Sequence, residues 1–131
     1  MTASPLRVLV AEDNDDLREL LVTIISAEPD LHCVGAANEV DAVLEHSGHD
    51  VDVLVLDLEL NGRSSIDLLK TLRRKGSKIF IVVFSGHSHP DMVKHTLAAG
   101  ADAYVTKSDD YEVLLEAIRN PAGRLAAAAA E

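Results

Sequence analysis

With 131 residues, 47% of them hydrophobic and only 3% aromatic, the chain is long enough for one domain with an aliphatic core. Its formal net charge of -10 argues against direct binding to nucleic acid or to an anionic membrane, because both need a basic surface. No apolar run approaches membrane-spanning length, and the first five residues lack the charged and apolar regions of a signal peptide. We therefore expect a cytoplasmic protein.

Apolar runs alternate with segments of helical periodicity along the chain. The runs typical of strands cover residues 6–11, 31–35, 51–57, 78–84 and 101–107. The helical segments cover residues 15–27, 38–44, 66–76, 90–99 and 108–120, with Asn38 and Ser108 as expected N-caps. Residues 61–65 are predicted to form a polar loop. This alternation indicates an α/β fold, in which right-handed crossovers place helices on both faces of one doubly wound, five-stranded parallel sheet.

The third predicted strand ends in a carboxylate. The unbroken run Val53–Leu56 is typical of a strand buried on both faces, and Asp57 follows it directly. Folds of this class carry ligands and reactive groups at the carboxyl ends of their strands. Asp57 is therefore the first candidate for a functional residue.

Other reactive side chains follow three further strands. In the expected sheet, the strand ends bring Glu12, Asp13, Ser85 and Lys107 close to Asp57. Three carboxylates at close quarters repel one another, and oxygen ligands without Cys or His suit a hard cation such as Mg²⁺. A lysine can hold a phosphoryl oxygen, and a serine hydroxyl adds a hydrogen bond. Together these groups fit the attack of an aspartate carboxylate on a phosphorus atom.

This set of residues resembles that of a known family. It is similar to the motif set of the CheY-like receiver domain of two-component response regulators, represented here by Glu12, Asp13, Asp57, Ser85, Tyr104 and Lys107. The similarity extends from Leu6 to Asn120, and segments 27–31 and 34–37 resemble the branch in which a receiver precedes a helix-turn-helix DNA-binding domain. The resemblance implies a flavodoxin-like (βα)5 fold with strand order 2-1-3-4-5.

The resemblance also implies how the site works. Asp57 would accept a phosphoryl group from a sensor histidine kinase, a phosphotransfer protein or a small phosphodonor. Mg²⁺, with Mn²⁺ as an alternative, would bind Glu12, Asp13, Asp57 and the backbone carbonyl of Glu59. Apart from this phosphoryl transfer and its autodephosphorylation, the protein would not be an enzyme.

The switch residues follow from the same resemblance. Ser85 and Lys107 would contact the phosphoryl group, Tyr104 would be the switch aromatic, and His87 could line the entrance to the site. Inward movement of the Ser85 hydroxyl would vacate space for the Tyr104 ring. The surface formed by the fourth helix, fifth strand and fifth helix would then be remodelled.

Several positions depart from the family pattern. Asn61 and Ser65 stand where receivers commonly carry Pro and Gly, so we expect a different loop after the third strand. Ser108 follows Lys107 where Pro is frequent, so the peptide between them is expected to be trans. Glu59 adds a carboxylate beside the expected metal site.

Three alternatives stay open at the level of sequence. Asp57-Leu58-Glu59 weakly resembles the Asp-x-Asp signature of haloacid-dehalogenase-type phosphatases, although the acidic pair precedes the nucleophile here. A flavin-binding protein would share the alternating pattern, but no phosphate loop rich in Ser, Thr and Gly follows the first strand. The third is a receiver fold that serves as a protein-interaction module without control by phosphorylation.

The predicted domain organisation is a receiver over residues 1–121 and an Ala-rich tail or start of a linker over residues 122–131. The chain could be a stand-alone regulator or a receiver cut from a longer protein. Besides the phosphodonor protein, the expected partners are a downstream protein target or a C-terminal output domain, and a second copy in a phosphorylation-dependent homodimer. Nucleic acid and membrane are not expected to be direct partners.

Overall fold

Five parallel strands form one sheet in the computed structural model, which describes residues 4–47 and 50–120. The strands are β1 (Leu6–Ala11), β2 (Leu31–Ala37), β3 (Val53–Leu56), β6 (Phe80–Ser85) and β7 (Ala103–Thr106). Their spatial order is β2-β1-β3-β6-β7, which is the predicted order 2-1-3-4-5. The predicted fold is therefore confirmed, whereas the predicted tail over residues 122–131 lies outside the described residues.

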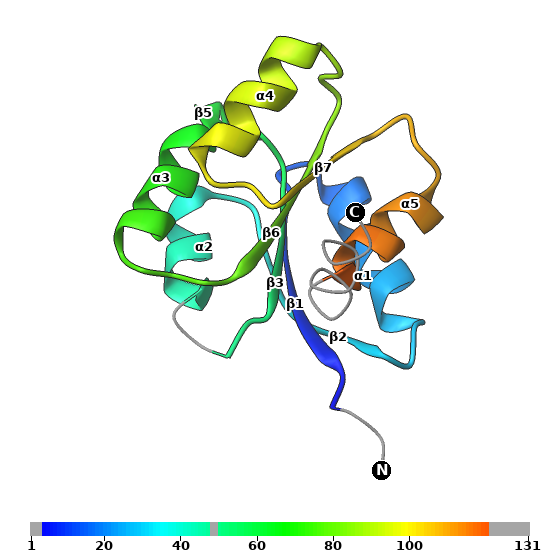
Figure 1. The fold of residues 1–131 in the computed structure, drawn as a ribbon. Helices are drawn as coiled ribbons and strands as arrows, with labels where there is room; N and C mark the ends of the chain where they lie inside the picture. The colour runs from blue at the N-terminus through cyan, green and yellow to red at the C-terminus, as the bar shows by residue number, and fades with distance from the viewer. Residues whose placement is uncertain (1–3, 48–49, 121–131) are drawn as a thin grey trace, which may run out of the picture.

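Helices cover both faces of the sheet (Figure 1). One face carries α1 (Asp15–Ser26) and α5 (Tyr111–Ile118). The other carries α2 (Val40–Ser47), α3 (Ile66–Arg74) and α4 (Pro90–Ala99). Among the described residues, no helix combines the length and apolar character needed to cross a membrane.

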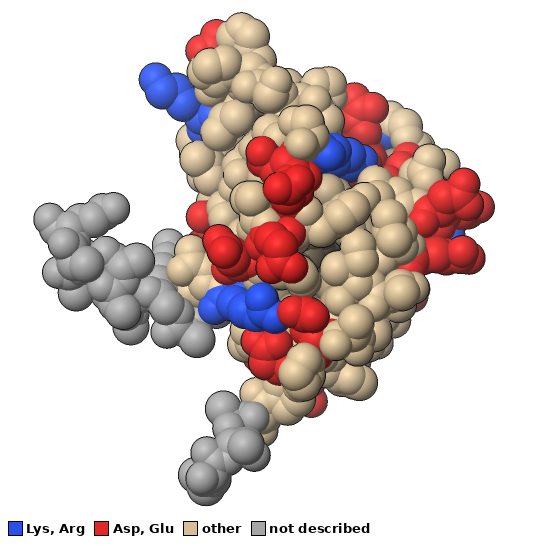
Figure 2. Space-filling view, turned by 90° about the vertical axis from the view of Figure 1, so that its right-hand side faces the viewer, with Lys and Arg blue, Asp and Glu red and all other residues tan. Residues whose placement is uncertain are grey.

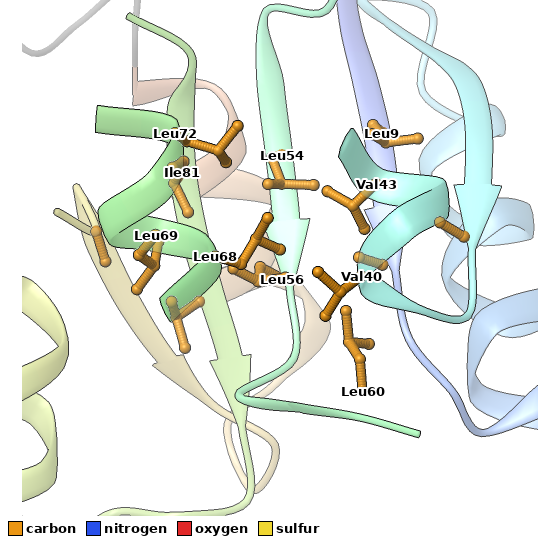
Figure 3. Packing of buried hydrophobic residues seen from close by; sticks show 14 of the residues in the cluster. Leu9, Val40, Val43, Leu54, Leu56, Leu60, Leu68, Leu69, Leu72 and Ile81 are labelled. Carbon is orange, nitrogen blue, oxygen red and sulfur yellow. The ribbon is translucent and has the colours of Figure 1, made fainter. Parts of the chain in front are cut away.

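The sheet separates two hydrophobic clusters. Leu54 and Leu56 of β3 face α2 and α3, where Figure 3 shows them among Val43 and Leu68. Val53 and Val55, the alternate residues of the same strand, pack in the cluster beneath α1 and α5. All four residues of β3 are buried, which explains why this strand has no alternation of apolar and polar residues.

The segment after Asp57 corrects the predicted polar loop. Residues 61–64 do not form an irregular loop but belong to a hairpin of β4 (Glu59–Leu60) and β5 (Arg63–Ser64). Asn61 and Gly62 form its turn with φ of 53° and 81°, and two positive φ values are typical of the Asn-Gly type I′ turn. Leu60 is fully buried in the cluster of Figure 3 and anchors the hairpin to the core.

The start of α5 corrects a second prediction. Ser108 is not the N-cap, because α5 begins at Tyr111 and its N-cap residue is Asp110. The Asp109 carboxylate accepts hydrogen bonds from the backbone N–H and the hydroxyl of Thr106 at 3.1 and 3.0 Å, which turns the chain before the helix begins. The described residues contain no cis peptide bond, so the predicted trans peptide after Lys107 is confirmed.

The face that carries α1 and α5 is acidic. In Figure 2, which views this side, Asp and Glu side chains far outnumber those of Lys and Arg. Exposed acidic residues of the two helices are Asp15, Asp16, Glu19, Glu112 and Glu116. A face with this charge repels the phosphate backbone of nucleic acids.

An ion pair between β1 and the residue before β3 makes the stability depend on pH. The Arg7 backbone N–H and guanidinium Nε both donate to Asp52 Oδ2, at 2.8 and 3.2 Å. The bond from the guanidinium lowers the pKa of Asp52 below its ordinary value of about 3.9, despite opposing desolvation. A carboxyl group whose pKa is lower in the folded than in the unfolded protein stabilises the fold at pH values above its pKa in the unfolded protein. This stabilisation is lost as the pH falls through its pKa in the folded protein.

We therefore expect Asp52→Asn to lower the free energy of unfolding at neutral pH, and the difference from the parent to shrink as the pH falls below about 3.9 and through the lowered pKa of Asp52 in the folded state. Urea titrations of both proteins across this range measure it. Asp50→Asn is the control, since Asp50 is 91% exposed and 3.7 Å from the Arg7 guanidinium, and exposed pairs contribute little. A constant difference between Asp52→Asn and the parent at all pH values would contradict the prediction.

Candidate functional site

The carboxyl ends of β1, β3 and β7 bring together four of the residues that the sequence singled out. Glu12 and Asp13 follow β1, Asp57 follows β3, and Lys107 follows β7. One carboxylate oxygen from each of the three acidic residues lies within 4.8 Å of the others. Glu12 is buried, Asp57 is half-buried and Asp13 is exposed, so the cluster extends from the protein interior to the surface.

Lys107 supplies the positive charge of this cluster. Its Nζ lies 2.9 Å from Glu12 Oε1 and donates a hydrogen bond of 3.1 Å to Asp57 Oδ2. The first contact is an ion pair without hydrogen-bond alignment. The Lys107 backbone N–H donates to the Ser85 carbonyl at 2.8 Å, which continues the pairing of β7 with β6 and sets where the side chain starts.

Burial and the mutual contacts change the pKa values of these groups. Burial raises the pKa of the Glu12 carboxyl, although Lys107 and the Asn14 N–H act in the opposite direction. Desolvation alone would lower the pKa of the Lys107 ammonium, but Glu12 and Asp57 outweigh it and raise this pKa. The lysine is therefore positively charged at neutral pH.

The hairpin after β3 reaches the outer carboxylate. The Asn61 N–H donates to Asp13 Oδ2 at 2.9 Å, from the turn whose positive φ values aim it there. Desolvation raises the pKa of Asp13, but this hydrogen bond and other contacts outweigh it, so the pKa is lower than usual. Asp13 is consequently ionised at neutral pH.

The side chains of Ser85 and Tyr104, two of the predicted switch residues, both form hydrogen bonds with the backbone of His87. Ser85, the last residue of β6, is buried, and its hydroxyl accepts a hydrogen bond of 3.1 Å from the His87 N–H. The Tyr104 hydroxyl donates to the carbonyl of the same His87 at 2.6 Å. Both side chains thus form hydrogen bonds with the loop between β6 and α4. Among the described residues, neither side chain forms a hydrogen bond with Asp57.

Two other predicted residues lie beside the cluster rather than in it. The exposed side chains of Glu59 and His87 line a cavity of about 280 Å³ together with His95 and Met92 of α4. The predicted role of Glu59 uses its backbone carbonyl, which lies two residues after Asp57 at the start of β4. His87 borders the cavity and stays a predicted entrance residue.

Three polar contacts of the site were not predicted from the sequence. They come from Asn61, from Ser65, whose hydroxyl donates to the Asp57 carbonyl at 2.6 Å, and from Asp109, which orders the loop after Lys107. Only the contact of Asn61 was indicated by the sequence, because Asn-Gly between short strands is typical of a hairpin. The other two depend on which atoms the fold brings together.

Comparisons with known proteins identify the family. The profile of the response regulator receiver domain matches residues 8–119. This chain belongs to that family. The receiver is 33% identical over 118 residues to the nitrate/nitrite response regulator protein NarP of Escherichia coli K12, and 34% identical over 119 residues to NarL of the same organism. These alignments cover 89% and 90% of the receiver, which spans about half (55%) of the length of each relative.

Solved structures support the same assignment. A two-component response regulator of the LuxR family from Aurantimonas sp. SI85-9A1 aligns with a TM-score of 0.82 and 28% identity, covering 88% of the receiver and 84% of that chain. The response regulator domain of Thermotoga maritima CheB aligns with a TM-score of 0.79 and 27% identity, covering 88% of the receiver and 95% of that chain. The receiver is thus a phosphorylation-dependent signalling module of a two-component system, which decides against the phosphatase and flavin alternatives.

Proposed function

We propose that Asp57 is the residue of this receiver that accepts the phosphoryl group, in a reaction that depends on Mg²⁺. The observation that carries this proposal is the contact of one ammonium group, Lys107 Nζ, with both Asp57 and the buried Glu12 inside a cluster of three carboxylates. Such an arrangement combines a nucleophilic carboxylate with groups that stabilise charge on the transferred phosphoryl oxygens.

The residues fit a magnesium ion. The three side-chain donors are carboxylate oxygens that lie within 4.8 Å of one another, and one side of the cluster is exposed, which leaves room for the water ligands that Mg²⁺ retains. Glu12, Asp13 and Asp57 would hold the ion, together with the backbone carbonyl of Glu59. When bound, Mg²⁺ would neutralise charge on the carboxylates and on the phosphoryl oxygens. Mn²⁺, which also takes oxygen ligands, is the expected substitute.

The chemical step uses groups of this chain. An oxygen of the Asp57 carboxylate forms a bond to phosphorus while the bond from phosphorus to the donor breaks, and the leaving group departs with the electron pair. The Lys107 ammonium, held by Glu12, supplies positive charge to the new phosphoryl oxygens. Hydrolysis of the same acyl phosphate by water restores Asp57 and releases inorganic phosphate, so both reactions take place on the chain's own aspartate.

The switch then acts through the loop at His87. A phosphoryl group on Asp57 draws the Ser85 hydroxyl away from the His87 N–H, and the loop that carries the Tyr104 acceptor moves with it. Tyr104 loses its outward hydrogen bond and turns toward the space beside Ser85. The surface formed by α4, β7 and α5 changes as a result.

The partners are proposed from the relatives. The phosphoryl donor is a sensor histidine kinase or a phosphotransfer protein, and the site of action is the cytoplasm. Because the chain spans 55% of the length of NarP and NarL, its target is a C-terminal output domain or a separate protein, with a phosphorylation-dependent homodimer as a third partner.

Intact-mass spectrometry tests the proposal directly. After incubation of the chain with MgCl₂ and acetyl phosphate, we expect one added phosphoryl group, which is absent in Asp57→Ala and after addition of a chelator. Asp67→Ala is the matched control, because Asp67 is an exposed aspartate in the first turn of α3 and should leave the adduct intact. An adduct that persists in Asp57→Ala would assign another acceptor. A folded parent without any adduct, and without stabilisation by beryllofluoride and Mg²⁺, would overturn the proposed function.

A further inference from the structure

The residue that precedes α3 makes an unusual contact. Ser65 is the N-cap residue of α3, a position where serine ordinarily accepts a hydrogen bond from the first helical turn. Its hydroxyl forms no such bond and instead donates to the backbone carbonyl of Asp57 at 2.6 Å. The side chain is completely buried, so water does not replace this contact.

The contact joins the two ends of the segment 57–65, which contains the hairpin of β4 and β5. The Ser65 N–H donates to the Leu58 carbonyl at 2.7 Å, next to the bond from its hydroxyl to Asp57. One buried residue therefore satisfies two consecutive carbonyls at the base of β4 and β5. The neighbouring Ser64 is exposed, and its hydroxyl accepts from the Ile66 N–H at 3.3 Å, away from Asp57.

Both backbone polar groups of Asp57 are thus held. Its N–H donates to the Ala11 carbonyl at 3.0 Å, at the end of the pairing between β3 and β1. Its carbonyl, beyond the last paired residue of β3, accepts the Ser65 hydroxyl. With both ends of the residue restrained, the direction of its Cα–Cβ bond is set, and the carboxylate reaches Lys107 Nζ at 3.1 Å.

We infer that Ser65 is a positioning residue for phosphoryl transfer, acting through its hydrogen bond to the Asp57 carbonyl; this inference rests on the proposed role of Asp57. Removal of the hydroxyl leaves a buried carbonyl without its partner and lets the peptide between Asp57 and Leu58 rotate. The nucleophile then departs from in-line geometry, where small misplacements have large effects on rate. The Ser65 hydroxyl does not contact the phosphoryl group itself. We therefore expect its removal to change the rate of phosphorylation and the lifetime of the phosphorylated Asp57.

The test compares the phosphorylation rates of the parent, Ser65→Ala and Ser64→Ala with acetyl phosphate and MgCl₂. Ser65→Ala is expected to react about 10-fold more slowly, and Ser64→Ala, with the same chemical change one residue earlier, at the rate of the parent. The ¹³C′ chemical shift of Asp57 supplies a readout independent of activity, because it moves when the carbonyl loses its hydrogen bond. Arg73→Met serves as a destabilised variant with an intact site, because it removes a guanidinium that bonds to the Gly100 carbonyl and to Asp102, before the amino end of β7.

The outcomes separate positioning from stability. Two results together support the inference. Ser65→Ala is phosphorylated more slowly than the parent and shows an altered ¹³C′ shift of Asp57. Arg73→Met is less stable than the parent but is phosphorylated at the parental rate. A folded Ser65→Ala that reacts at the parental rate overturns it, as does an equal slowing in Arg73→Met. Should Ser65→Ala fail to fold, Ser65→Cys fills the same buried space with a thiol that is only a weak hydrogen-bond donor. A parent that forms no adduct would instead overturn the proposed function, and this inference with it.

Discussion

Replacing Lys107 with alanine is expected to slow the phosphorylation of Asp57 by about 100-fold, the size of effect found when a preorganised charge-stabilising donor is removed from an active site. The ammonium group contacts both Glu12 Oε1 and Asp57 Oδ2, so its loss also leaves a buried carboxylate facing a second one. We expect the free energy of unfolding to fall by about 1–2 kcal/mol without metal, and by less with Mg²⁺ present, because the cation replaces part of the missing charge.

The rate of adduct formation by intact-mass spectrometry and urea titration with and without MgCl₂ measure the two effects. Lys78→Ala is the matched control, since it makes the same change in net charge at an exposed position before β6, at the opposite edge of the sheet. Its rate and stability should equal those of the parent. If Lys107→Ala reacted as fast as Lys78→Ala, the proposed contact of the ammonium group with the phosphoryl oxygens would be wrong.

Arg73→Met is expected to give the largest loss of stability, about 3 kcal/mol in the free energy of unfolding. The guanidinium donates to the backbone carbonyls of Ser77, Ile79 and Gly100 at 3.0, 2.8 and 2.9 Å, and forms an ion pair with Asp102 at 2.8 Å. This one side chain connects the end of α3 with the loops before β6 and β7. Methionine preserves the apolar stem of the arginine but none of the four contacts.

Arg74→Met is the control for this prediction. Arg74 is exposed, and its side chain bonds only within its own helix among the described residues, to the Lys70 carbonyl and the Thr71 hydroxyl at 3.4 Å. Equal urea midpoints for the two variants would show that the Arg73 contacts do not stabilise the fold. The phosphorylation rate of folded Arg73→Met should match the parent, because Arg73 lies at the amino ends of β6 and β7 and Asp57 lies at the carboxyl end of β3.

The residue at which a helix begins was harder to predict than the presence of the helix. Ser108 and Asp110 both lie before α5, and either residue type can cap a helix. The structure places the Ser108 hydroxyl 3.0 Å from that of Thr106 and lets Asp109 order the loop, so the helix begins later than predicted. Such competing short-range hydrogen bonds differ little in free energy, and the surrounding packing decides between them.

The sequence by itself determined the α/β class of the fold and the composition of the main site, whereas the strand order was implied by the resemblance to receiver domains. Fully apolar runs such as Val53–Leu56 are typical of strands covered on both faces, and helices between such strands favour parallel pairing. Because the carboxyl ends of parallel strands share one edge of the sheet, the meeting of Glu12, Asp57 and Lys107 follows from their positions after strands. The catalytic roles of these residues stay predictions that the proposed experiments test.

Only the tertiary structure decided which polar groups support that site and the rest of the fold. The bond from Ser65 to the Asp57 carbonyl spans eight residues, and the ion pair between Arg73 and Asp102 spans 29. Neither pair has a spacing that marks it in the sequence, because such contacts form only after β3, α3 and the loops around them have packed. Hydrophobic periodicity reports which face of an element is buried, whereas the partner of each buried polar atom depends on where the packed elements place it.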